Sequence, residues 1–109
     1  YYEYLKKNDN ILLPQTNYNH YCTFQNFEIL IKHRNKLKKF LLAHGIETLI
    51  QWRGVTLNKL NLSNLKKIGS YVNTKYYFNH CICLPINESL SDNDIKYISN
   101  KINYFYNKL

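Results

Sequence analysis

The segment from residue 24 to residue 54 reads FQNFEILIKHRNKLKKFLLAHGIETLIQWRG, and its hydrophobic period changes twice. Its first part is aromatic and β-branched and free of Gly and Pro, which is typical of a half-buried strand. After Arg34 the apolar side recurs at i, i+3, i+4 and i+7, as on one face of an amphipathic helix. These positions are Leu37, Phe40, Leu41 and His44. Gly45 follows where a helix end needs a residue that tolerates positive φ. The pattern predicts a strand, a helix and a second strand in succession.

The predicted fold class is α/β, more narrowly an α+β small domain with a three-stranded sheet covered by helices. We expect strands at residues 21–31, 47–52 and 82–84, the last one ended by Pro85, which has no N–H for a ladder. Helices at residues 34–44 and 92–108 would cover one face of the sheet. The opposite face of the sheet must then be covered by another part of the protein.

The helix at residues 92–108 has the clearest start signal in the chain. Ser91 and Asp94 have the spacing of a capping box, with a shorter acid than usual. An apolar stripe then recurs along the helix, which favours packing on a sheet. The stripe consists of Ile95, Ile98, Ile102, Phe105 and Leu109.

Four weaker elements complete the prediction. Residues 1–7 have a helical pattern, and residues 11–14 are extended because Pro14 disfavours the α conformation before it. Residues 55–65 form a weak helix. Residues 74–81 form another, whose Tyr76, Tyr77 and Phe78 would reach the core or a neighbouring subunit.

The formal charge of +8 raises the question of a nucleic acid partner. We predict none, because Asn, Lys, Ile and Tyr all come from AT-rich codons and the lysines are scattered. No run of about 18 apolar residues could cross a bilayer, so we expect no membrane association. The 109 residues suit one domain. With Tyr1 first and no Met, we interpret the chain as a piece of a longer cytosolic protein.

Cys22, Cys81 and Cys83 are an odd number of cysteines without a CxxC spacing, so reduced thiols are expected. Together with His20 and His80 they contain possible zinc ligands. We disfavour a metal site, because Cys81 and Cys83 are two apart in a predicted strand. Small thiols on one strand face usually fill a core.

Three parts of the sequence resemble the C-terminal small domain of the DegT/DnrJ/StrS family of sugar aminotransferases, which are pyridoxal-phosphate enzymes of fold type I. They are FQNFEI at residues 24–29, HGIETLIQW at residues 44–52 and CLPINESLSDNDIKYISNKI at residues 83–102. The resemblance implies that residues 1–19 end a large-domain helix and form a linker, and that residues 20–109 form the small domain. It also implies a cytoplasmic homodimer that transfers an amino group from an amino acid, typically glutamate, to a nucleotide-linked keto-sugar for polysaccharide or antigen biosynthesis.

The resemblance also implies where the site residues lie. Pyridoxal phosphate would be bound by the large domain, so no catalytic and no cofactor-binding residue is assigned in this chain. Gln51, Trp52 and Arg53 stand where relatives place residues facing the nucleotide-sugar. Many relatives have His and Tyr there, and a closer subset has Gln and Trp followed by two glycines, from which Arg53 departs. His20 would lie near the substrate entrance.

Each of these residues also has a purely structural interpretation. Gln can bond a sugar hydroxyl or a pyrimidine edge, Trp can stack on a base or a sugar, and Arg can reach a diphosphate. Equally, Trp52 can be the largest core residue, Arg53 a solvated turn residue, and His20 a surface residue at the start of a strand.

An alternative function needs no catalysis. The basic, Tyr-rich α+β pattern is compatible with a ferredoxin-like RNA-binding module, although no strand has the basic, aromatic and Gly-containing form that stacks on bases. A protein-interaction or regulatory module is a third possibility. The residues themselves show no nucleophile beside a base and no phosphate-binding Gly loop, since only three glycines are present.

Overall fold

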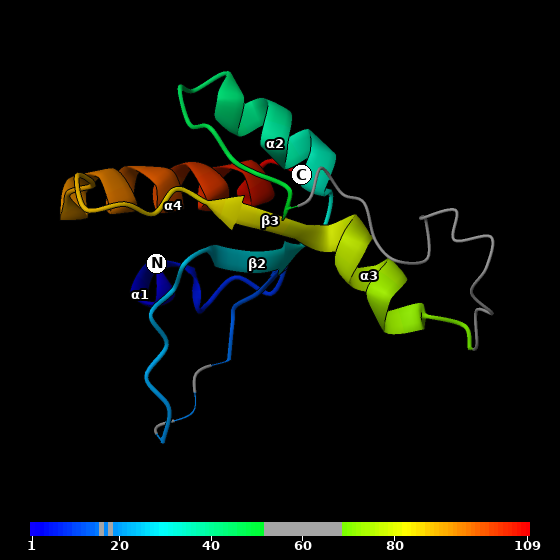
Figure 1. The fold of residues 1–109 in the computed structure, drawn as a ribbon. Helices are drawn as coiled ribbons and strands as arrows, with labels where there is room; N and C mark the ends of the chain where they lie inside the picture. The colour runs from blue at the N-terminus through cyan, green and yellow to red at the C-terminus, as the bar shows by residue number, and fades with distance from the viewer. Residues whose placement is uncertain (16, 18, 52–68) are drawn as a thin grey trace.

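The structure, a computed structural model, describes residues 1–15, 17, 19–51 and 69–109. Over these residues the chain forms α1 (Tyr2–Leu5), β1 (Ile11–Leu12), β2 (Phe27–Ile31), α2 (Arg34–Leu42), α3 (Val72–His80), β3 (Cys81–Leu84) and α4 (Asp92–Asn107). Figure 1 shows the sheet with α2 and α4 packed beside it and α3 leading directly into β3. The predicted α/β class with a three-stranded sheet is confirmed.

The sheet has the order β1-β2-β3, and both neighbouring pairs are antiparallel. Leu49 adds a single antiparallel bridge on the free side of β3, through two backbone hydrogen bonds to Cys83 of 2.8 and 3.2 Å. Because β2 and the bridge are both antiparallel to β3, the segment around Leu49 runs parallel to β2. The first strand and the helix of the predicted unit are therefore present, but its second strand is reduced to the Leu49 bridge, and β3 lies between β2 and that bridge.

The sheet buries one face under helices. β2 alternates, so that Phe27, Ile29 and Ile31 are buried while Glu28 and Leu30 are half-buried on the opposite face. The buried side chains of β2 and β3 form one cluster with apolar residues of α1, α2 and α4. The helical members are Leu5, Leu37, Leu41, Ile98, Ile102 and Tyr106. The predicted cover of the sheet by α2 and α4 is thus confirmed, and α1 adds to it.

The end of α2 follows the sequence prediction at Gly45. This residue has a φ of +74°, its N–H donates to the Leu42 carbonyl over 3.0 Å, and the Ile46 N–H donates to the Leu41 carbonyl over 2.9 Å. These two bonds form a Schellman motif, which a left-handed residue permits. Leu41 and Ile46 are both buried, so the hydrophobic contact that accompanies the motif is present as well.

The start of α4 is also as predicted, but its apolar stripe is not. Ser91 and Asp94 form a reciprocal capping box. Ile98 and Ile102 are buried, whereas Leu109 is 64% exposed. The prediction was wrong at the end of the stripe, where Tyr106 turns inward and its hydroxyl donates to the Lys32 carbonyl over 2.6 Å.

Two strand predictions were wrong in extent. The strand expected at residues 21–31 begins at Phe27, because Phe24 has a φ of +47° and because the ladder with β3 stops at the pair Phe27 and Leu84. Pro85 follows Leu84 and cannot donate to the ladder. The strand expected at residues 47–52 is reduced to the bridge at Leu49, and β1 takes its place as the third strand.

The remaining elements differ in smaller ways. α3 begins at Val72 and ends at His80, and it buries none of its own side chains. Of the two alternatives for Tyr76, Tyr77 and Phe78, insertion into the core was wrong, and contact with a neighbouring subunit stays a prediction. The weak helix expected at residues 55–65 lies outside the described residues. None of the helices that the structure describes has the length and hydropathy of a membrane span.

Candidate functional site

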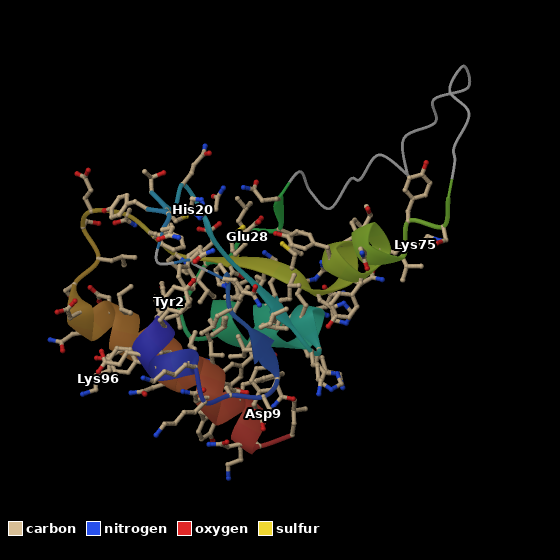
Figure 2. The ribbon with its side chains drawn as sticks, turned by 90° about the horizontal axis from the view of Figure 1, so that it is seen from below. Tyr2, Asp9, His20, Glu28, Lys75 and Lys96 are labelled. Atoms are coloured by element: carbon tan, nitrogen blue, oxygen red, sulfur yellow. The ribbon has the colours of Figure 1, made fainter. Side chains whose placement is uncertain are left out.

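A polar cluster occupies the sheet face opposite the one that α1, α2 and α4 cover. Figure 2 shows α1, α2 and α4 on one side of the sheet and the labelled Glu28 on the other. In the ladder Glu28 pairs with Cys83, and Leu30 pairs with Cys81, so both thiols lie on the same face as the carboxylate. The prediction that the two cysteines share one face is confirmed, but they lie outside the main apolar cluster.

Glu28 accepts three hydrogen bonds in this cluster. The thiols of Cys81 and Cys83 donate to its Oε1 atom over 3.6 and 3.4 Å, and the Tyr77 hydroxyl donates to Oε2. Glu28 is half-buried and joins α3 to β2 through Tyr77.

The protonation states in the cluster follow from burial and from the Glu28 charge. Burial first, and the Glu28 carboxylate second, raise the pKa of Cys83 to about 12 and that of Cys81 to about 11. Burial and the hydrogen bond to Glu28 also raise the pKa of Tyr77. At neutral pH all three groups therefore keep their protons and act as donors, and the two thiols are poor nucleophiles.

Gln51 lies at the edge of this cluster. It stands two residues after the Leu49 bridge and is half-buried. Its backbone N–H slightly lowers the pKa of the Cys83 thiol, against the larger raising effects of burial and Glu28. The next two predicted substrate-binding residues, Trp52 and Arg53, lie outside the described residues.

His20 belongs to the connection between β1 and β2, which Figure 1 shows extending away from the sheet. It is exposed, and its backbone N–H donates to the Asn17 carbonyl over 2.9 Å. Although His20 and Glu28 overlap in Figure 2, no hydrogen bond joins His20 to Gln51 or Glu28 among the described residues. Its role at the substrate entrance stays a prediction.

A cavity of about 630 Å³ lies beside the Leu49 bridge. Its lining includes the carboxylates of Glu47 and Asp94, the side-chain amides of Gln25 and Asn26, and Thr48, whose buried Oγ1 has no hydrogen-bond partner. No Lys or Arg is present among the described residues that line it. Two carboxylates without a cation disfavour a phosphate group at this position.

The described residues were also compared with the ligand sets that metal ions require. Within residues 1–15, 17, 19–51 and 69–109, no group of three or more His, Cys, Asp or Glu side chains could hold a metal ion. All three cysteines are free thiols.

Comparison with known proteins identifies the family. A sequence profile of the DegT/DnrJ/EryC1/StrS aminotransferase family matches residues 1–103. The chain belongs to this family. Among curated proteins, a sequence search gave no match.

Solved structures share the fold of this chain. A DegT DnrJ EryC1 StrS aminotransferase from Brucella abortus matches with a TM-score of 0.84 and 23% identity, and DesV of S. venezuelae, solved with a ketimine intermediate, matches with 0.85 and 20%. Each match covers 95% of this chain and 28% of the solved chain. The sugar aminotransferase CalS13 from Micromonospora echinospora gives 0.73 and 13%, over 94% and 27%. The chain thus spans about 28% of the length of the solved chains that it matches.

Aminotransferases of the DegT/DnrJ/EryC1/StrS family use pyridoxal phosphate, which needs an amine for its aldehyde and donors for its phosphate. The cavity beside Leu49 offers carboxylates instead of these groups. Lys38, which is half-buried, already donates its Nζ protons to the Thr48 carbonyl over 2.6 Å. The residues that the structure describes do not fit this cofactor.

Proposed function

We propose that this chain is the C-terminal small domain of a pyridoxal-phosphate-dependent nucleotide-sugar aminotransferase. The family match over residues 1–103 carries the proposal, and the shared fold with solved aminotransferases, one of them a sugar aminotransferase, supports it. The enzyme would act in the cytoplasm as a homodimer, and a large domain outside this chain would bind the cofactor. It would transfer an amino group from glutamate to a keto-sugar linked to a nucleotide.

In this proposal the small domain supplies one wall of the sugar site. Gln51 ends the segment that the Leu49 bridge attaches to the sheet, so a rigid element holds its main chain. The Gln51 amide would bond a sugar hydroxyl or a pyrimidine edge, Trp52 would stack on the base or sugar, and Arg53 would reach the diphosphate. His20 would border the entrance.

The first test uses the full-length polypeptide that contains this chain. We expect it to absorb as a bound pyridoxal-phosphate enzyme, to form a dimer in light scattering, and to aminate a keto-sugar linked to thymidine or uridine diphosphate with glutamate as donor. A full-length polypeptide without a cofactor-binding large domain would contradict the proposal.

The second test assigns the sugar wall. Gln51→Ala should lower kcat/KM for the nucleotide-sugar about tenfold, the value of one hydrogen bond in a dry site. The glutamate half-reaction should change less. Asn100→Ala, which removes an exposed amide on α4, is the matched control and should change neither half-reaction. Equal losses in both half-reactions would rule out the role of Gln51.

Trp52 and Arg53 are tested in the same assay. If Trp52 stacks on substrate, Trp52→Ala leaves the melting temperature nearly unchanged and weakens the sugar half-reaction. If it fills the core, the same change costs about 3–5 kcal/mol of stability. Arg53→Gly restores the commoner family residue, and weaker sugar binding in this variant would identify Arg53 as a diphosphate contact.

A further inference from the structure

The peptide unit between Thr48 and Leu49 is held from both sides. Its N–H, which belongs to Leu49, donates to the Cys83 carbonyl of β3 over 3.2 Å, and the Leu49 carbonyl accepts from the Cys83 N–H over 2.8 Å. Its carbonyl, which belongs to Thr48, accepts from Lys38 Nζ over 2.6 Å. A strand and a side chain of α2 therefore fix the same peptide unit.

The geometry of a trans peptide explains why a side chain is needed here. The carbonyl and the N–H of one planar trans unit point to opposite sides. Since the Leu49 N–H points at β3, the Thr48 carbonyl points away from the sheet, where no described strand pairs with it. Thr48 is only 6% exposed, so water has little access to this carbonyl, and leaving it unpaired would be costly. Lys38 supplies the donor that a further strand would otherwise give.

Lys38 differs in its surroundings from the other lysines of α2. Lys36 and Lys39 are exposed, whereas Lys38 is half-buried. A lysine of this kind lays its alkyl stem along the protein and uses only its ammonium group for polar contacts. The ammonium has three protons and no lone pair, so its bond to the Thr48 carbonyl has one possible direction.

We propose that Lys38 is a positioning residue, which holds the Thr48–Leu49 peptide at the edge of the sheet and so fixes the main chain that leads to Gln51 two residues later. The assignment of Gln51 to the sugar rests on the proposed function. The contact of Lys38 with Thr48 rests on the geometry alone. Without the ammonium group, the hydrogen bonds described for the Thr48–Leu49 peptide would be those with Cys83.

The first experiment tests the contact without using any substrate. In the full-length protein, hydrogen–deuterium exchange is read at the Leu49 amide by mass spectrometry with fragmentation. Lys38→Met keeps the alkyl stem and removes the donor, so exchange at Leu49 should be about fivefold faster, as expected for one lost hydrogen bond. Lys39→Met removes the same charge from the next, exposed position and should leave this exchange within twofold. Equal exchange at Leu49 in the two variants would overturn the proposal.

The Ile46 amide shows whether the effect is local. It donates to the Leu41 carbonyl over 2.9 Å in the motif that ends α2, so it does not depend on Lys38. Its exchange in Lys38→Met should stay within twofold of the unmodified protein. If Ile46 and Leu49 speed up equally, the substitution has lowered the stability of the whole domain, and the positioning role is overturned.

The second experiment measures both half-reactions in single turnovers, with a keto-sugar linked to thymidine diphosphate and with glutamate. Lys38→Met should lower kcat/KM for the sugar about three- to tenfold and change the glutamate half-reaction less than twofold. Lys39→Met should change both less than twofold. Lys38→Arg keeps a charged donor at this position and should recover part of the sugar rate.

The two experiments distinguish the positioning role from the proposed function. A full-length protein that lacks any sugar aminotransferase activity contradicts the proposed function, while exchange at Leu49 still decides whether Lys38 holds the peptide. If exchange responds but both half-reactions fall equally in Lys38→Met, Lys38 does not position a sugar contact, and the positioning role is overturned.

Discussion

Glu28 is a half-buried carboxylate whose described partners are two thiols and a phenol, all neutral at pH 7. Hydrogen bonds to a charged acceptor are stronger than those between neutral groups, so three donors can hold the carboxylate without a basic side chain. The environment of the cluster in turn changes the pKa values of the three donors. Because all three groups are desolvated by burial, and because a second negative charge beside Glu28 is unfavourable, Cys81, Cys83 and Tyr77 resist ionisation.

Alkaline pH should therefore destabilise the fold. Cys83 and Cys81 release their protons near their ordinary pKa of 9.0 when unfolded, but only near 12 and 11 when folded. The folded state thus binds more protons over this range, and the free energy of unfolding falls as pH rises from about 9 to 12. We expect the melting temperature to drop between about pH 8.5 and 10.5, and to drop less in Cys83→Ala. A constant melting temperature over this range would contradict the assignment.

Removing the charge of Glu28 should make the same thiols more reactive. Glu28→Gln deletes the second cause of the raised pKa in Cys81 and Cys83, so a larger fraction of each becomes thiolate at pH 9. We expect faster alkylation by iodoacetamide at both residues, measured by peptide mass spectrometry. Cys22 is exposed and serves as the internal control, whose rate should stay unchanged. Because unfolding would also expose both buried thiols, circular dichroism must show that Glu28→Gln keeps the fold, and unchanged alkylation rates at Cys81 and Cys83 in the folded variant would contradict the prediction.

Among the helices, α4 depends on its first turn. The Ser91 hydroxyl accepts from the Asp94 N–H over 3.3 Å, and Asp94 Oδ2 accepts from the Ser91 N–H over 2.9 Å. Ser91→Ala should lower the free energy of unfolding by about 1 kcal/mol, measured by urea denaturation. Ser89→Ala, in the loop just before, should cost less than about 0.5 kcal/mol. Equal losses would argue against the cap.

Adjacent leucines in α2 test how the helix packs. Leu41 is fully buried and closes the Schellman motif with Ile46, whereas Leu42 is 63% exposed. Leu41→Ala should cost about 2–5 kcal/mol, and Leu42→Ala less than about 1 kcal/mol. Thermal unfolding followed by circular dichroism would measure both, and similar losses would contradict the orientation of α2.

Elements set by local chemistry could be predicted from the sequence, and those set by distant partners could not. The capping box and Gly45 depend on neighbours within six residues, and both are present as expected. The start of β2 depends on the positive φ of Phe24 and on the partner strand β3. β3 lies more than 50 residues further along the chain, and its ladder with β2 ends at Leu84, just before Pro85. Likewise, β1 is a strand only because Ile11 pairs with Ile31, and the local sequence around Ile11 does not show this pairing.

The same distinction applies to the candidate site. Gln51 could be singled out because the family resemblance places it, at the end of an expected strand, where relatives have residues that face the nucleotide-sugar. Glu28 and Cys83 could not be paired, since they are 55 residues apart and only the register of β2 against β3 brings them together. The available signal was the spacing of Cys81 and Cys83, which placed two donors on one face without showing what they faced.

At the scale of the whole molecule, this chain should not bind pyridoxal phosphate stoichiometrically. Lys38 and Lys101 are half-buried, and the other lysines in the described ranges are exposed, so none has the desolvated setting that favours a stable adduct. Incubation with the cofactor, reduction with borohydride and peptide mass spectrometry should show only scattered, partial labelling. Complete labelling of one lysine would contradict both this expectation and the assignment of the cofactor to a large domain.

The position of β3 between β2 and Leu49 has a consequence for biosynthesis. On the ribosome, the two flanking segments emerge well before the strand that joins them. The N-terminal helix α1 also forms its contacts late. The Tyr1 hydroxyl donates to the Pro85 carbonyl, and the Asn103 side-chain amide donates to the Tyr4 carbonyl. Pairings so distant along the chain form slowly. The apolar face of β2 therefore stays open until translation has passed the last helix, which makes the nascent chain a natural client for a chaperone.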